Sequence, residues 1–439
     1  TRPLFSGGDE MYAYAIGVRV DPGDAFAFAK GQELTLADGR THVKLAKPLD
    51  FAAVTDHAET FDVMYRCTDP QYLDHPYCAG FREASRPVAP IEAFRRFFYP
   101  LVAGDKATLA PICDAASGEC AAARVSQWRR VQEFANAANE PCRFTAFVAN
   151  EWSATPNGRH WHRNLIFASD KVSAFPINYV DQPTVDALWD ALDRECRAES
   201  GCDVIAIPHN MNLAEGGGFD VETASDERLR QRMRYERLAE IHQHKGNSEC
   251  LPAYGIDDTA DCDFERMLPP RLVGPGRKPV DEATWQQLRS SYYRSLLSRG
   301  LVMYRQRGID PLQLGAVAST DTHNGTAGYV GEADWRGTFG PDFAAAVRFS
   351  LFPDANPGGL VGVWAEQNTR ASIFAALKRR ETFATSGPRI VLKFFAVPGA
   401  AKDACAQPDA PAGAIVMGGE IPREARAGRK GRRMTFVVQ

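Results

Sequence analysis

The 439-residue sequence has little that would suit it to a membrane or to nucleic acid. It contains no apolar run near the roughly 20 residues that a membrane-spanning helix requires. Its 51 Lys and Arg are outnumbered by 55 Asp and Glu, so the basic excess typical of nucleic-acid-binding proteins is missing. It also lacks the paired Cys-x-x-Cys motifs of a structural zinc site. We therefore expect no membrane span and no nucleic-acid partner, and any anionic ligand must be attracted by a local site.

The chain does contain ten cysteines, and most of them lie in close pairs along the sequence. The pairs are Cys67/Cys78, Cys113/Cys120, Cys196/Cys202 and Cys250/Cys262. Their neighbours are rich in Pro, Gly, Asp and Asn, which is typical of loops, and loops closed by disulfides persist in oxidising compartments. We therefore predict that all four pairs are disulfides and that the protein is periplasmic or secreted. A first residue other than Met suits a chain freed of its signal peptide, and equally a trimmed one.

Apolar runs rich in β-branched or aromatic residues alternate with amphipathic segments along the chain. The runs are typical of buried strands followed by loops, and they cover residues 49–59, 143–153, 162–169, 203–212 and 314–325. The amphipathic segments predict helices over residues 91–102, 120–139, 183–196, 226–243 and 281–308. Strands that alternate with helices indicate an α/β fold with a largely parallel sheet. In such folds, active sites gather at the carboxyl ends of the strands.

The predicted strands carry side chains at their ends that can bind a metal ion. Asp321 and His323 lie two residues apart in the stretch STDTHNG, so at a strand end they share one face. Carboxylate oxygens and imidazole nitrogens are ordinary ligands of zinc, manganese and iron. The other strand ends supply Asp56, His57, Glu151, His162 and His209. Any one of these histidines alone could be structural, but together they predict a site for two or three divalent ions, Mn, Zn or Fe.

A further polar segment, EIHQHKGNSEC at residues 240–250, falls at the end of the helix predicted over 226–243. It carries His242, His244, Lys245 and Glu249, which could lie over the site with Lys245 facing an anionic substrate. The alternative is a solvated helix terminus, where cations oppose the helix dipole favourably. The sequence leaves both interpretations open.

Several blocks of the sequence together form a recognisable pattern. They are LDFAAVTDHAE, HRNLIF, IPHNMNLAEGG, EIHQHKGNSEC, STDTHNGTAG and LKRRETFATSGPRI. In this order, from about Pro22 to Arg389, they resemble a large bacterial family of unknown function, often exported. That family is similar to the polymerase and histidinol phosphatase (PHP) superfamily of metal-dependent phosphoesterases. The resemblance implies a distorted (β/α)7, TIM-like barrel of PHP type with helical and loop insertions.

The resemblance also implies a domain division and a site. Residues 1–395 would form the metallohydrolase domain, and residues 396–439 would begin an incomplete C-terminal β extension in which MTFVVQ is a strand without its sheet. Asp56 would orient a metal ligand. His242, Lys245 and Arg163 have no secure counterpart in the family, and we assign them to the substrate on charge and place alone. The implied metal ligands are His57, Glu151, His162, His209, Asp321 and His323.

One feature of the family pattern is missing from this sequence. The resemblance implies a His-x-His pair at the end of the first strand, but the chain passes from Phe5 directly to Ser6. The pair is either deleted or left out of this numbering. A metal-free protein would most readily lose order in a loop that carries two metal ligands.

The function predicted from these features is hydrolysis of a small anionic ester. Two metal ions would lower the pKa of a bridging water towards ~7, and the resulting hydroxide would attack a phosphate ester, or a sulfate or phosphonate ester. One alternative is a non-catalytic exported binding protein on a PHP scaffold, which the missing His-x-His pair favours. Another is an amidohydrolase-like hydrolase acting on amides, although the sequence shows no evident position for a carboxylated lysine.

Overall fold

The structure is a computed structural model. It describes residues 18–36, 38–72, 74–79, 112, 118–256, 261–269, 272, 279–331, 333–338, 355–399, 410–421 and 434–439. The predicted helix over 91–102, the junction of Phe5 with Ser6, Cys113 and Cys405 lie outside the described residues. Within the described ranges, no helix combines the length and the apolar character that a membrane crossing demands.

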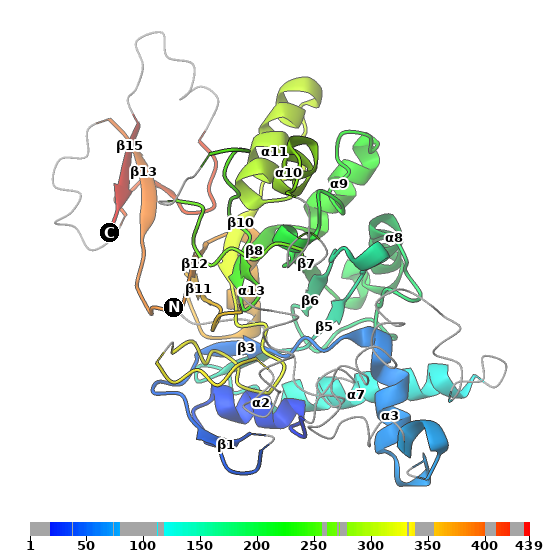
Figure 1. Ribbon diagram of the computed structural model, residues 1–439. Helices are drawn as coiled ribbons and strands as arrows, with labels where there is room; N and C mark the ends of the chain where they lie inside the picture. Colours follow the sequence, from blue (N-terminus) through cyan, green and yellow to red (C-terminus); the bar gives the residue numbers. More distant parts are fainter. Residues whose placement is uncertain are drawn as a thin grey trace.

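Small sheets of two or three strands form the centre of the molecule (Figure 1). Among the described residues, only β3 with β4 and β8 with β10 pair in parallel as strands. The other pairs are antiparallel: β1 with β2, β5 with β6, β6 with β7, β8 with β9, β11 with β12, and the pairs of the C-terminal sheet described below. The strands are β1 (Leu34–Thr35), β2 (His42–Val43), β3 (Phe51–Ala53), β4 (Thr145–Phe147), β5 (Ala149–Trp152), β6 (Arg163–Phe167), β7 (Val204–Pro208), β8 (Leu238–Gln243), β9 (Gly246–Asn247), β10 (Gly315–Ala318), β11 (Leu360–Val363) and β12 (Thr382–Thr385).

The predicted barrel and the largely parallel sheet are both wrong. Throughout the described part of the chain, hydrogen bonds join the strands into separate small sheets, and none of these closes into a barrel. The connection from β5 to β6 shows why. A parallel crossover needs about a dozen residues and usually a helix. Residues 153–162 contain only the short 3-10 turn η5 (Pro156–Gly158), so the chain returns antiparallel.

The predicted helix over 226–243 ends halfway. Helix α9 (Asp226–Tyr235) begins where the Ser225 side chain accepts a hydrogen bond from the Arg228 backbone N–H, a normal helix cap. The second half of the segment is strand β8, which is buried at every position except the half-buried Ile241. Burial of β8 against β7 and β10 outweighs the helix propensity of its residues. The polar segment 240–250 therefore lies on a β-hairpin and not at a helix end.

Helices surround the strands, with α2, α3 and α7 packed together on one side and α10 and α11 on the opposite side (Figure 1). The helices predicted over 120–139 and 183–196 are confirmed as α7 and α8, and the one over 281–308 is divided into α10 and α11. The helices are α2 (Pro22–Ala29), α3 (Phe61–Thr68), α7 (Glu119–Ala138), α8 (Val185–Glu195), α10 (Glu282–Arg289), α11 (Tyr293–Arg307) and α13 (Arg370–Arg379), with 3-10 turns η1 (Ala58–Thr60), η2 (Pro70–Tyr72), η6 (Ala198–Ser200) and η7 (Met211–Leu213).

One apolar core joins strands that belong to different sheets. Its buried side chains come from β3, β4, β5, β6, β7, β8, β10, β11 and α13, and include Phe51, Phe147, Ile166, Ile207, Leu238, Val317, Val361 and Phe374. Each fully buried side chain of this kind contributes about 1.5–3 kcal/mol. Shared packing, rather than one continuous hydrogen-bonded sheet, therefore holds these strand ends close together.

A separate sheet lies at the C-terminal end of the described chain (Figure 1). Strand β13 (Phe394–Pro398) pairs antiparallel with β14 (Ile415–Val416) and with β15 (Met434–Val438). The segment MTFVVQ therefore has a sheet, contrary to the prediction. The predicted boundary between residues 395 and 396 falls inside β13.

Three of the predicted disulfides are confirmed. Cys67 is bonded to Cys78, Cys196 to Cys202 and Cys250 to Cys262. Cys120 is also disulfide-bonded, and its predicted partner lies outside the described residues. Cys142 is free and exposed.

Candidate metal centre

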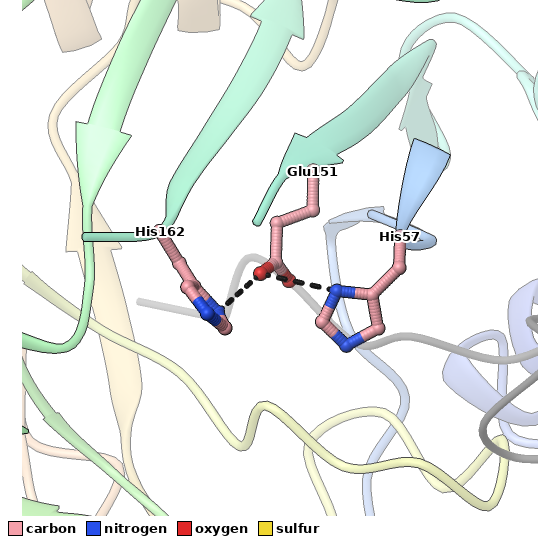
Figure 2. Close-up of side chains that lie close together, drawn as sticks. All are labelled: His57, Glu151 and His162. Atoms are coloured by element: carbon pink, nitrogen blue, oxygen red, sulfur yellow. Dashed lines mark ion pairs between the residues drawn. The ribbon is translucent and has the colours of Figure 1, made fainter. Parts of the chain in front are cut away.

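Three buried side chains converge where β3, β5 and β6 meet (Figure 2). Glu151, on β5, points between His57, which follows β3, and His162, which precedes β6. Its Oε1 lies 3.3 Å from His57 Nδ1 and 2.7 Å from His162 Nδ1. One ligand atom from each residue lies within 4.8 Å of the others, so the three could share a metal ion. We call His57, Glu151 and His162 the first trio.

The backbone brings the first trio together. The chain beyond β3 continues beside β5, because His57 and Glu151 form a parallel bridge and the Glu151 N–H donates to the Asp56 carbonyl at 2.9 Å. Strand β6 runs antiparallel to β5, with Arg163 opposite Trp152. The start of β6 therefore lies at the same edge as the end of β5, and His162 faces Glu151.

Two hydroxyl groups hold the histidines of the first trio. Ser153 Oγ hydrogen-bonds to His57 Nδ1, and Thr155 Oγ1 lies 2.8 Å from His162 Nε2. Buried Glu59 in turn accepts the backbone N–H of Ser153 at 3.0 Å. Partners of this kind fix the orientation and the tautomer of an imidazole, which is what a metal-binding histidine requires.

A second group, which we call the second trio, consists of His244, Asp321 and His323. Its ligand atoms also lie within 4.8 Å of one another, and His244 Nε2 is 3.6 Å from Asp321 Oδ2. His244 lies in the turn between β8 and β9, and the other two residues follow β10. Asp321 has φ +47°, a left-handed conformation that few residues other than Gly, Asn and Asp adopt. That conformation lets the acid and His323 face His244 from a loop.

His209 joins the two trios. It directly follows β7, is completely buried, and places Nε2 3.5 Å from Glu151 Oε1. Glu151, His209 and Asp321 also have ligand atoms within 4.8 Å of one another. Neither His209 Nε2 nor Glu151 Oε1 makes a well-directed hydrogen bond to any described residue, as expected of atoms that coordinate a cation. The joined set, which we call the His–acid cluster, is His57, Glu151, His162, His209, His244, Asp321 and His323.

Electrostatics favour a cation in the His–acid cluster. Burial lowers the pKa of His162 to about 4 and that of His323 to about 3, so both imidazoles are neutral near pH 7, the form that binds a metal ion. Burial would raise the pKa of Glu151, but His57, His209 and His162 together hold it well below its usual value. Neutral imidazoles beside ionised carboxylates fit a divalent Zn, Mn or Fe ion.

All six predicted metal ligands belong to the His–acid cluster, and His244 is added to them. His242, which was predicted to contact the substrate, lies elsewhere. Its Nε2 is 2.9 Å from Glu265 Oε2, and its ring stacks on Phe264. The hairpin explains why His244 and not His242 reaches the cluster. His242 is paired with Asn247 inside the sheet, while His244 occupies the turn.

Arg163 was also predicted to contact the substrate, and the structure uses it differently. Its guanidinium donates from Nε to Glu236 Oε1 at 2.9 Å and from Nη2 to the Gly218 carbonyl at 2.7 Å. The charges that shift its pKa after burial are those of Glu236, Arg232 and Asp220, none of which belongs to the cluster. The guanidinium therefore forms a buried structural ion pair in place of the predicted substrate contact.

The remaining two predictions concern Asp56 and Lys245. Asp56 is completely buried and contacts Glu151 through its backbone carbonyl, so it lies directly behind the first trio. The orienting role of its carboxylate stays a prediction. Lys245 does lie at the cluster, where its Nζ pairs with Asp321 and approaches His244.

Two residues at the cluster were not predicted. The ring of His160 stacks on that of His162 with centroids 4.9 Å apart, and the spacing His160-Trp161-His162 is itself a His-x-His signal. Glu240 on β8 is completely buried, and burial, with the nearby Asp321 charge, raises its pKa well above the usual value. Interpreting residues 238–243 as a strand would have drawn attention to Glu240, because an acid inside a buried strand is unusual.

Comparisons with known proteins place the chain in a family. No curated protein and no solved structure matches it. The profile of one family, described as a protein of unknown function (DUF3604), matches residues 9–439, which is nearly the entire chain. The chain belongs to the DUF3604 family.

Proposed function

We propose that this protein is a metal-dependent hydrolase of small phosphate esters, with sulfate or phosphonate esters as related substrates. The observation that carries the proposal is the His–acid cluster, in which two buried trios are joined through Glu151, His209 and Asp321. A single structural histidine needs no such set of imidazoles around two carboxylates. The sequence blocks resemble a family that is similar to the PHP phosphoesterases, and this similarity supports phosphate ester hydrolysis as the reaction.

Divalent ions bound by the cluster would neutralise charge on the oxygens of the ester and make a bound water acidic. The residues of the chain itself would do the rest. Lys245 supplies a positive charge beside the second trio, suited to an anionic ester. Burial holds the pKa of His160 well below its usual value, so its imidazole, which stacks on His162, could act as a base rather than as an acid.

The alternatives make different predictions about the same site. A non-catalytic binding protein would retain metal and bind an anion without turnover. An amidohydrolase-like enzyme would cleave amides in preference to phosphate esters. We also propose that the protein works in an oxidising compartment, periplasmic or secreted, and the disulfides among the described residues support this.

The test compares wild-type protein with His323→Ala and with the control His42→Ala. His42 is an exposed histidine on β2 that pairs with Glu33, so it reports on the loss of a histidine that does not belong to the cluster. After treatment with a chelator, each protein is supplied with Mn²⁺ or Zn²⁺, and metal content, melting temperature and hydrolysis of a chromogenic phosphate ester are measured.

We expect wild type and His42→Ala to retain metal and to hydrolyse the ester. In His323→Ala the metal content and the turnover should fall together while the melting temperature changes little, because a ligand rather than a core side chain is removed. Metal retention without hydrolysis would favour the binding protein, and cleavage of amides alone would favour the amidohydrolase-like enzyme. If wild type retains no transition metal, the proposal is wrong.

A further inference from the structure

The second trio already contacts a cation that belongs to the protein. Lys245 Nζ forms an ion pair with Asp321 Oδ2 and lies 3.3 Å from His244 Nε2. Both atoms belong to residues that would bind a metal ion in the second trio. The first trio differs, because Glu151 pairs with histidines alone among the described residues. Lys245 is only 6% exposed, so its ammonium is held inside the site and not at the surface.

The backbone that carries this ammonium is fixed. His244 and Lys245 are the two turn residues of the β8–β9 hairpin, since Gln243 pairs with Gly246. The His244 N–H donates to the Thr320 carbonyl at 3.3 Å, and the Lys245 N–H donates to Gln243 Oε1 at 2.9 Å. Any shift of the turn would break these bonds.

Contacts from outside the hairpin restrain the turn as well. The side-chain amide of Asn212 donates to the Lys245 carbonyl at 2.9 Å, and the Asn356 N–H donates to the His244 carbonyl at 3.1 Å. Gly246 has φ +92°, and a Cβ there would collide with the Glu265 carbonyl. The main chain of the turn therefore stays in place, and the long side chain of Lys245 is the part that can rotate away.

We propose that Lys245 is a built-in competitor for the second trio, so that the first trio takes up its metal ion first and the second trio fills more weakly. This inference rests on the proposed function. Asp321 is the only carboxylate of the second trio, and a divalent ion beside its Oδ2 would have to share that oxygen with the ammonium. Two cations a few ångströms apart in a buried site also repel each other strongly.

Displacement gives Lys245 a second partner. Once its ammonium leaves Asp321, it is an unpaired positive charge at the edge of a cation site, and a phosphate dianion would pair with it. The second ion therefore strengthens the binding of phosphate, because it frees Lys245. By linkage, phosphate must strengthen the binding of the second ion by the same factor. Substrate and second metal ion would thus arrive together.

The test is calorimetric titration of the chelator-treated full chain with Mn²⁺ or Zn²⁺. Wild type should show one tight and one weaker phase, or the tight phase alone. In Lys245→Met, which keeps the length of the side chain and removes its charge, the second ion should bind about tenfold or more tightly while the first is unchanged. Lys245→Arg should behave as wild type. Inorganic phosphate should tighten the second phase in wild type and leave it unchanged in Lys245→Met.

Several results would overturn the inference. One is a second phase that is unchanged or weaker in Lys245→Met. If the melting temperature shows that Lys245→Met does not fold, Lys245→Gln takes its place, and the same result in that variant would overturn the inference. His323→Ala assigns the phases, because it should remove the weaker one alone. Metal binding to the first trio without any effect of Lys245 would contradict only the competition. Absence of every phase in every variant would instead contradict the proposed function, and the competition with it.

Discussion

The two halves of the His–acid cluster are built in different ways. The first trio is held at the ends of paired strands, and the hydroxyls of Ser153 and Thr155 fix its imidazoles. The second trio is assembled from a tight turn and a loop, with Asp321 at positive φ. A lysine contacts the second half, and no such contact is present among the described neighbours of Glu151. The carboxylate of the first half has no cationic lysine or arginine beside it among the described residues, while the carboxylate of the second half is already paired with the Lys245 ammonium.

The two halves also differ in the groups that lower the pKa of their carboxylates. Burial would raise the pKa of Glu151, but His57, His209 and His162 hold it well below its usual value, so this carboxylate stays ionised in the first trio. Burial opposes ionisation of Asp321, but the Lys245 ammonium and then His244 hold its pKa below the usual range. Imidazoles therefore hold the carboxylate of the first trio, and an ammonium holds that of the second trio.

The largest effect is expected from Glu151→Gln. Glu151 belongs to the first trio and to the group that joins the trios, so its charge supports both halves. We expect metal affinity to fall by about 1,000-fold, because loss of a residue that only orients a ligand already costs about 10- to 100-fold. Titration calorimetry with Zn²⁺ measures this. Glu140→Gln, an exposed acid paired with Lys30, is the control and should leave the affinity unchanged. A loss confined to one phase would show that the halves are independent.

A smaller effect is expected from acid. The folded-state pKa of His162 is about 4, below its ordinary value of 6.5, so the stability linked to this group is complete above pH 6.5 and is lost as the pH falls towards 4. The shift corresponds to about 3 kcal/mol. Urea unfolding of metal-free protein across this range should therefore show a steeper loss in wild type than in His162→Gln. Parallel curves would contradict the neutral state of this imidazole, and His42→Gln serves as the control.

The smallest effect is expected from Ser153→Ala. Removing the hydroxyl that holds His57 should weaken the first, tight phase of metal binding by about tenfold and leave the second phase unaltered. The control Ser126→Ala removes an exposed hydroxyl on α7 that bonds to the Ala122 carbonyl. Equal weakening of both phases would remove the distinction between the halves.

Much of the site could be predicted because it depends on strand ends. Apolar runs that end in His, Asp or Glu identify their own boundaries, and the shared core then brings those ends together. This logic requires no knowledge of how the strands pair. It therefore found Glu151, His209 and Asp321 even though the expected barrel was wrong.

The part that failed was decided by tertiary contacts. Residues 226–243 contain no Gly or Pro that would separate a helix from a strand, and only burial between β7 and β10 makes the second half extended. The choice of His244 over His242 depends on the position of a turn, which local sequence left open. The buried pairing of Arg163 with Glu236 joins residues that are far apart in the chain, so charge and place alone could not identify it.

The two-residue turn at His244 and Lys245 also has a consequence for how the chain can change in length. Because loop length and turn type go together in a hairpin, one residue inserted between Gln243 and Gly246 would change the turn that carries His244 and Lys245. One event would then move a metal ligand and its competing lysine together. Natural variation in length should therefore accumulate in the disulfide-closed segment between Cys250 and Cys262, where the bond keeps the ends together, and should spare the turn.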